Sequence, residues 1–492
     1  MQFVCYFVIF CLYFFPVSAS YAENAKSTYS LTIYSSAAPG AISPDSYRPA
    51  PGSSYAYQNA RAIPGYAIIR QMQPLTLDKK ENDITFSDVA AYIDPTTVMF
   101  TSLTHPETTH VIEQNYLFDL VSTAKLLERY IGKKITVEQI VGDSISSYDG
   151  TLMSTQGSIV LKDNDNKLLT LNNYSNLRFP ELPGGLMTKP TLLWHIQTDD
   201  PGTHQTRVSY QTDGITWWSD YNVQFQEGKD ANSGVLDLSA WVSIINQSGA
   251  SYNDATLKLM AGDVQRAAQP VYYRKSAMLA MDGEMAAAPG FAEKSFFEYH
   301  LYTLNHPATL PDNSTKQLEL FPTAYSIPAE KELIYNGQQD TKVAVYLKFK
   351  NDKKYGLGVP LPAGRIRVSK RDEADGNLEF IGEDVIQHTP KDEEIKIKLG
   401  NAFDVVGERK QTNYYTDNTR KYAEETVEIS LRNHKHEAVK VIAEEPLQRY
   451  ANWTITDTSK SYDKKDAYTV HFPVTLKPDG EEKIRYTVRY TW

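Results

Sequence analysis

The sequence predicts a mainly β protein: a small barrel module of the SH3-like or Sm-like type with one helix, followed by two immunoglobulin-like β-sandwich units. Three observations support this prediction. Short runs in which apolar and polar residues alternate recur along the chain, and this period is typical of half-buried strands. Turns rich in Gly, Pro, Asn and Asp separate the runs. The 33 tyrosines also favour strands, because Tyr suits a pleated, half-buried surface.

The composition is that of a globular protein with an acidic surface. Hydrophobic residues make up 41% of the 492 residues and charged residues 22%, which is enough to bury a core. A chain of this length has about three domains as a first expectation. The formal net charge of –10 argues against nucleic acid or anionic lipid as a partner.

Residues 1–22 are predicted to be a signal peptide. An unbroken apolar run covers residues 3–15, which is too short to span a bilayer. Ser20-Tyr21-Ala22 supplies the small side chains of a cleavage site, so the mature chain would begin at Glu23. No Lys or Arg precedes the apolar run, and the alternative is therefore that the segment is retained as a membrane anchor.

Both cysteines, Cys5 and Cys11, lie within residues 1–22. The mature chain would thus lack disulfides, thiol nucleophiles and cysteine metal sites. Export without cysteine is more typical of a bacterial periplasm than of disulfide-rich secretion. We expect an exported protein of the periplasm or cell surface, with no integral membrane domain in the mature chain.

Residues 23–189 are predicted to form a β-rich N-terminal region. A loop rich in Pro, Gly and Ser is expected at residues 37–54. A helix is expected at residues 117–131, where apolar residues follow three/four spacing and Gly132 would end the helix. The apolar positions are Leu117, Leu120, Val121, Ala124, Leu127 and Ile131. Short strands follow the helix and predict the small barrel at residues 133–180.

Residues 190–335 and 336–492 are predicted to form the two β-sandwich units, because short strands recur there between polar turns. In the first unit, Asp213-Gly214 lies between two alternating runs and is typical of a two-residue type I′ hairpin turn. The alanine-rich segment 276–292 is predicted to be a flexible loop.

Several stretches, taken in order, resemble bacterial proteins that carry the DUF4139 domain, a family of unknown function. They are SYQTDGITWWSDYNV (209–223), LSAWVSIINQSGASYNDATLKLMAGDVQR (238–266), FFEYHLYTLNHPATLPDNSTKQLEL (296–320) and LPAGRIRVSKRDEADGNLEFIGEDVIQHTPKDEEIKIKLGNAFDVVGERKQTNY (361–414). The N-terminal third is similar to a proteobacterial branch of the family through IDPTTVMFTSL (93–103), EQNYLFDLVS (113–122) and KLLERYIGKKI (125–135). The resemblance implies an exported, β-rich envelope protein and brings no assigned catalytic residues.

The residues themselves predict no catalytic group, metal site or cofactor. The chain contains no Walker loop, Gly-x-Gly-x-x-Gly fingerprint, His-Glu-x-x-His motif or Gly-x-Ser-x-Gly elbow. His434 and His436 lie in a polar interval that favours a solvated turn. The Asp/Asn runs at residues 163–166 and 372–377 lack the full spacing of a calcium loop and favour turns.

Neighbouring carboxylates do not predict a glycosidase pair. Glu444 and Glu445, for example, would point to opposite faces of a strand, whereas the two catalytic carboxyls of a glycosidase face one cleft. The pairs Glu383/Asp384 and Glu424/Glu425 have the same spacing. We therefore expect solvated surface carboxylates.

Trp218 is the one candidate binding residue. In a strand that begins at Ile215, Trp217 would face the core and Trp218 the polar side, with Asp220 and Asn222. A lone aromatic side chain on a polar face is either covered by a neighbouring segment or is a contact for a glycan or a partner.

The sequence favours a non-enzymatic, exported cell-envelope protein that binds or scaffolds an envelope protein or glycan. One alternative is a hydrolase acting on peptidoglycan or polysaccharide, with carboxylates that meet only in the fold. Another is membrane association through a retained N-terminal segment. The oligomeric state is left open.

Overall fold

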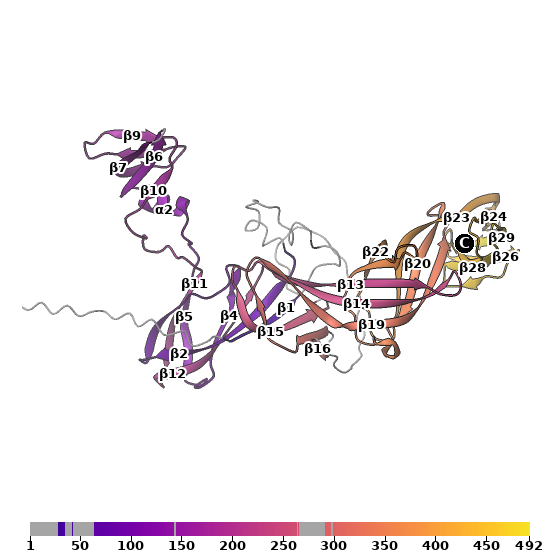
Figure 1. Cartoon of the computed structure of the whole chain (residues 1–492), viewed down its shortest axis with the longest axis horizontal. Coiled ribbons are helices and arrows are strands. Elements are labelled where there is room, and N and C mark those ends of the chain that lie inside the picture. The colour runs from indigo at the N-terminus through magenta and orange to yellow at the C-terminus, as the bar shows by residue number, and fades with distance from the viewer. Residues whose placement is uncertain are drawn as a thin grey trace, which may run out of the picture.

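The computed structural model describes residues 28–34, 42, 63–141, 144–262, 264, 291–296 and 299–492. The predicted signal peptide, most of the loop at 37–54 and most of the segment 276–292 lie outside these residues. In the described part the chain is mainly β with one α-helix, as the sequence predicts (Figure 1). None of its helices has the length and hydrophobicity that crossing a bilayer requires.

One sheet of eight strands joins the start of the chain to its middle. In hydrogen-bonded order its strands are β16 (Phe291–Phe296), β17 (Tyr299–Leu304), β15 (Tyr252–Ala261), β1 (Thr28–Tyr34), β2 (Tyr66–Leu77), β12 (Gly202–Thr212) and β4 (Ile93–Ser102), with β18 (Ala308–Leu310) against β15. The β1–β15 pair is parallel. Because β2 pairs with β12 and β1 with β15, this sheet continues across the division predicted at residue 190.

A three-stranded sheet carries the small module. It is formed by β3 (Glu81–Phe86), β11 (Thr191–Thr198) and β5 (Thr109–Leu117), with β11 in the middle. The chain leaves this sheet after β5 and returns at β11, so the module is an insertion between two paired strands (Figure 1). The outgoing and returning segments are joined by backbone hydrogen bonds from Val121 to Met187 and from Met187 to Asp119, both of 2.9 Å.

The module consists of one helix and five strands around a core of its own. The helix is α2 (Thr123–Tyr130), and the strands are β6 (Lys134–Val141), β7 (Ser144–Ser154), β8 (Ile159–Lys162), β9 (Leu168–Leu171) and β10 (Asn176–Arg178), in the sheet order β10-β6-β7-β8-β9. Leu127 and Tyr130 of α2 pack on Val137 and Leu152 of the sheet. A helix followed by short strands therefore lies where the sequence predicts it.

The helix is shorter than predicted and begins at Thr123 instead of residue 117. Leu117 is the last residue of β5, and Leu120 lies exposed in the linker. The Ser122 side chain accepts a hydrogen bond from the Lys125 N–H and caps the helix there, which explains the later start. The predicted end is confirmed, because Gly132 has a left-handed φ of 83° just after the C-cap.

The largest sheet has thirteen strands. Its path is β22 (Leu378–Ile386), β21 (Gly364–Arg371), β13 (Ile215–Glu227), β14 (Ser233–Asn246), β19 (Ser314–Tyr335), β20 (Lys342–Lys350), β23 (Glu394–Asp417), β24 (Tyr422–Asn433), β29 (Glu481–Thr491) and β26 (Asn452–Thr458). β25 (Val439–Pro446) pairs with β19 and β28 (Thr469–Leu476), and β27 (Asp463–Lys464) pairs with β28. A short 3-10 helix, η3 (Lys353–Tyr355), follows β20.

The first part of this sheet curls until β22 approaches β23. The Lys398 N–H of β23 donates to Asp384 Oδ2 of β22 at 2.6 Å. A Cβ on Gly382 would lie 2.6 Å from the Leu399 carbonyl oxygen, so the close approach requires glycine there. The curled strands enclose one continuous core with the eight-stranded sheet.

A second core lies between β24 and β29 on one side and β25 and β28 on the other. The long strands β19 and β23, of 22 and 24 residues, run from the first core to the second. β19 also pairs directly with β20. The division predicted at residue 335 therefore falls within one hydrogen-bonded sheet.

The predicted hairpin at Asp213-Gly214 is wrong. β12 pairs with β2 and β4, whereas β13 pairs with β14 and β21, so the two strands belong to different sheets. Gly214 has a left-handed φ of 78°, and a Cβ there would lie 2.7 Å from the Gln247 carbonyl oxygen. The dipeptide connects the two sheets, because β12 pairs with the earlier strands β2 and β4 and β13 pairs with the later strands β14 and β21.

The predicted orientation of β13 is confirmed. Ile215, Trp217 and Tyr221 are at most 2% exposed and belong to the first core. Trp217 Nε1 donates to the Met260 carbonyl oxygen at 3.2 Å. The opposite face is itself covered where β13 begins, since Thr216 is fully buried.

We expect Trp217→Ala to lower the free energy of unfolding by about 3–5 kcal/mol, because it leaves a large cavity and removes the hydrogen bond to the Met260 carbonyl oxygen. Urea unfolding followed by far-UV circular dichroism measures the change. Trp241→Ala is the matched control: Trp241 is 38% exposed, so its loss should cost much less. Equal unfolding midpoints for the two variants would contradict the placement of Trp217 in the core.

Candidate functional site

The outer face of the large sheet that carries Trp218 also carries a second tryptophan. In the antiparallel pair β13–β14, Trp218 lies opposite Ser243 and Trp241 lies opposite Asp220. Opposed residues share a face, as do alternate residues of one strand, so all four side chains lie on the same side. The two tryptophans are thus diagonal neighbours, about 7–8 Å apart along the sheet. Trp241 is exposed and Trp218 is half-buried.

Asp220 is the centre of the hydrogen bonds on this face. Its Oδ2 accepts from Trp218 Nε1 at 2.7 Å and from Ser243 Oγ at 3.1 Å. Gln317 Nε2, from β19, donates to Ser243 Oγ at 3.1 Å. The Asp220 side chain is only 11% exposed, and these bonds hold the Trp218 ring in a fixed orientation.

Two arginines extend the same network on the other side of Asp220. β21 runs parallel to β13 and places Arg365 beside Asp220. Arg367 Nη1 lies 3.5 Å from Asp220 Oδ1, and its Nε donates to Glu383 Oε2 of β22 at 2.9 Å. Arg365 Nη1 lies 3.9 Å from the other Glu383 oxygen. Carboxylates and guanidinium groups therefore alternate across neighbouring strands.

This site is called the Trp218–Trp241 face below. It consists of Trp218, Asp220, Trp241, Ser243, Gln317, Arg365, Arg367 and Glu383, contributed by β13, β14, β19, β21 and β22. Flat indole rings beside a fixed row of polar groups suit a ligand that has both C–H surfaces and hydrogen-bonding groups.

Sequence reasoning placed Trp218 on the polar face correctly but missed Trp241. Its position between the core residues Ala240 and Val242 shows that it faces outward. What the sequence does not give is the register that brings it beside Asp220 and Trp218.

A second polar cluster lies where several strands of the curled sheet end. Lys331 Nζ and Lys370 Nζ lie 2.9 Å and 2.7 Å from the two oxygens of Glu227. Two adjoining cavities, of about 170 Å³ and 210 Å³, share Phe225, Glu227 and Lys370 in their walls. Burial would raise the pKa of Glu227, but the hydrogen bonds from Lys370 and Lys331 outweigh it and lower the pKa to about 2. This carboxylate is ionised at neutral pH and is no general acid.

The expectation of solvated surface carboxylates is wrong for Glu425 and Glu445, which are buried in the second core. Arg409 Nε donates to both oxygens of Glu445 at 3.0 Å, and the Tyr486 hydroxyl donates to the same carboxylate. Glu425 lies 3.7 Å from the Arg409 guanidinium. Burial raises the pKa of Glu445. The Glu445 and Glu425 side chains are only 0% and 5% exposed, so the cluster is part of the core, whereas a hydrolase needs its carboxyls open to substrate.

A serine–histidine pair that the sequence does not reveal is also internal. Ser102 Oγ lies 3.0 Å from His204 Nδ1, and His204 Nε2 lies 2.7 Å from the Asp200 carbonyl oxygen. Since a carbonyl only accepts, Nε2 carries the proton and Nδ1 accepts from the serine. Ser102 and His204 are 0% and 1% exposed, so the hydroxyl cannot reach a substrate in this structure.

The other histidine and acidic candidates lie apart. His436 is exposed and lies 3.7 Å from Asp479. Asp163 accepts from the Asp165 and Lys167 N–H groups, which is the geometry of a turn. Within residues 63–141, 144–262 and 299–492, no three His, Asp or Glu side chains are arranged to hold a metal ion.

One comparison with known proteins identifies a family. The family model described as "Domain of unknown function (DUF4139)" matches residues 206–492, more than half of the chain. The match includes every residue of the Trp218–Trp241 face and excludes the inserted module. No curated protein and no solved structure matches the sequence.

The lowered pKa of Glu227 predicts a pH-dependent contribution to stability. The ordinary value is 4.5 and the folded value about 2, so the contribution is present above pH 4.5 and lost as the pH falls toward 2. We expect Glu227→Gln to lower the free energy of unfolding at pH 7, with a smaller difference from wild type at pH 3. Urea unfolding at both values measures it. Glu373→Gln, an exposed carboxylate of the adjoining cavity, is the control. A Glu227→Gln effect that is equal at both pH values would contradict the assignment.

Proposed function

We propose that this chain, which belongs to the DUF4139 family, is exported to the cell envelope and works there as a non-enzymatic protein that binds a glycan. The observation that supports this proposal most directly is the Trp218–Trp241 face, where two indole rings stand beside ordered carboxylate, guanidinium and amide groups on one side of a sheet.

The chemistry of this face favours a sugar chain. A sugar ring has C–H groups on its two faces and hydroxyls at its rim. An indole ring can pack on the C–H groups, while Gln317, Arg365 and Glu383 can exchange hydrogen bonds with hydroxyls. Because strands of one sheet carry these groups, the face is extended and suits a polymer better than a small molecule.

The same geometry argues for binding instead of hydrolysis. Glu383, the more exposed carboxylate of the face, accepts a hydrogen bond from Arg367, and Asp220 accepts from Trp218 and Ser243. A glycosidase needs one protonated carboxyl at the scissile bond and a second free to act as base or nucleophile. Here both carboxylates are engaged in holding the face together.

Export is supported by the apolar run and the predicted cleavage site of residues 1–22, and by the absence of cysteine after residue 22. We expect the mature protein to begin at Glu23 and to be released with the periplasmic fraction. N-terminal sequencing of the purified mature protein tests this. A protein that keeps Met1 and remains with the membrane would instead support a retained anchor.

Glycan binding should depend on both indoles. We expect Trp241→Ala and Trp218→Phe to weaken cosedimentation with envelope polysaccharide or peptidoglycan by roughly two- to tenfold each, since an aromatic contact is worth about 0.5–1.5 kcal/mol. Trp218→Phe keeps a ring but removes the N–H donor to Asp220.

Trp492→Ala replaces an exposed tryptophan outside the Trp218–Trp241 face, just after β29, and is the matched control that should bind like wild type. Equal binding by all variants would overturn the role of the face. The wild-type protein could instead capture an envelope protein and no glycan, and Trp241→Ala could lose that capture. This result would identify the ligand of the face as a protein.

A further inference from the structure

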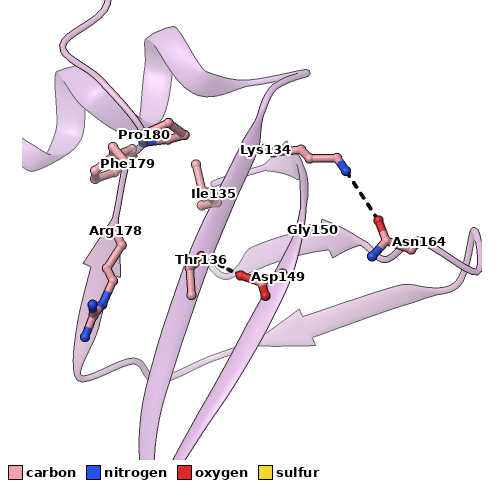
Figure 2. A pocket seen from close by; sticks show the side chains of 9 residues that line it. All are labelled: Lys134, Ile135, Thr136, Asp149, Gly150, Asn164, Arg178, Phe179 and Pro180. Carbon is pink, nitrogen blue, oxygen red and sulfur yellow. Dashed lines mark hydrogen bonds between the residues drawn. The ribbon is translucent and has the colours of Figure 1, made fainter.

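The inserted module has a polar cavity of about 410 Å³ between β6, β7 and β10 (Figure 2). Its walls include Lys134, Thr136, Asp149, Asn164, Arg178 and Phe179. The cavity lies outside the residues that match the DUF4139 family and far in sequence from the Trp218–Trp241 face.

Strand pairing sets three of these side chains in a row. Thr136 lies opposite Asp149 of β7 and also opposite Arg178 of β10. The three side chains thus stand on one face of adjacent strands. Strands are about 4.8 Å apart, so the acidic and the basic end of the row are separated by about 9–10 Å.

The acidic end is held in place by the middle residue. Thr136 Oγ1 donates to Asp149 Oδ1 at 2.5 Å, as Figure 2 shows. Asp149 is exposed, and it has two carboxylate oxygens with several acceptor positions. One hydrogen bond from a hydroxyl leaves capacity for a cationic donor.

Arg178, the basic end of the row, is oriented by one contact and keeps other N–H donors for a ligand. Arg178 Nε lies 2.8 Å from Glu138 Oε1, and the Glu138 side chain is only 8% exposed, whereas that of Arg178 is 71% exposed. A guanidinium has five N–H donors, so a contact through Nε leaves the outer nitrogens for a ligand. Lys134 is a second cation of the cavity, but its Nζ lies 3.4 Å from Asn164 Oδ1 and points away from Arg178 (Figure 2).

The charges and the spacing together specify the ligand. Asp149 disfavours a purely anionic ligand, and the two cations disfavour a purely cationic one. A molecule with an ammonium group at one end and a carboxylate at the other satisfies both ends of the row. A peptide residue extends about 3.3–3.6 Å, so two or three residues span the distance. The volume admits on the order of a dozen water-sized groups, which fits such a peptide.

We propose that the module binds a short peptide with free termini, of two or three residues. The peptide carboxylate contacts Arg178, the ammonium group contacts Asp149, and side chains lie along Phe179. This site is independent of the glycan proposal, because none of its residues belongs to the Trp218–Trp241 face.

Isothermal titration calorimetry of the full-length mature protein with trialanine tests the proposal. We expect trialanine to bind, and its N-acetylated and C-amidated forms to bind at least about tenfold more weakly, since each loses one charge-assisted contact. Asp149→Asn and Arg178→Gln should weaken trialanine binding to a similar extent. Asp149→Asn retains an oxygen that can accept from Thr136, so the local structure is kept.

Asp165→Asn is the matched control, an exposed acid of the same module outside the cavity walls, and should bind trialanine like wild type. Trp241→Ala should also bind trialanine like wild type. This control distinguishes a failure of the peptide proposal from a failure of the glycan proposal. Three results would overturn the proposal. They are equal affinity for the free and the capped peptides, equal trialanine affinity of Asp149→Asn and Asp165→Asn, and no heat of binding. Binding of inorganic phosphate in place of trialanine would instead define a simple anion site.

Discussion

The in-register pairing of β13 with β14 is the constraint on which the core and the Trp218–Trp241 face both depend. The ladder runs without a shift from Ile215 opposite Asn246 to Glu227 opposite Gly234. Because side chains alternate between faces, a slip of one residue would turn Trp217 outward and Trp218 inward. The same register that buries Trp217 therefore sets Trp241 beside Asp220. Core and surface are specified together.

The second core depends on a buried ion pair in addition to apolar packing. Arg409 of β23 reaches Glu445 of β25, and Tyr486 of β29 donates to the same carboxylate, so the group connects three strands. A buried carboxylate without partners would be costly, whereas here each oxygen has a donor. The cluster thus favours one arrangement of these strands over others. Its burial also explains why adjacent Glu444 and Glu445 have different roles: Glu444 lies 3.1 Å from His471, outside the core.

The sequence predicted what depends on local pattern and missed what depends on the choice of partner. The alternation of side chains along a strand correctly assigned Trp217 to the core and Trp218 to the other face. Gly132 correctly marked the end of the helix. Asp213-Gly214 looked like a hairpin because local turn chemistry does not show that β12 and β13 pair elsewhere. The sequence also did not predict which residues come together in the Trp218–Trp241 face or in the cavity of the inserted module. Thr136 and Asp149 face each other across the consecutive strands β6 and β7, but Arg178 joins them only because β6 also pairs with β10, which is distant in sequence.

The arrangement of the two sites favours scaffolding over communication between them. The inserted module has a core that shares no residue with the first core. It is connected to the three-stranded sheet by the segments that leave β5 and return to β11. Asp119 on the outgoing segment binds Arg129 of α2 at 2.8 Å, which fixes the helix on that segment without extending the packed interior. Coupling between sites requires a packed element with two arrangements that both ligands bias, and separate cores provide no such shared element. Binding at one site would then leave the other unchanged, and the chain would hold two ligands at a distance set by its strands.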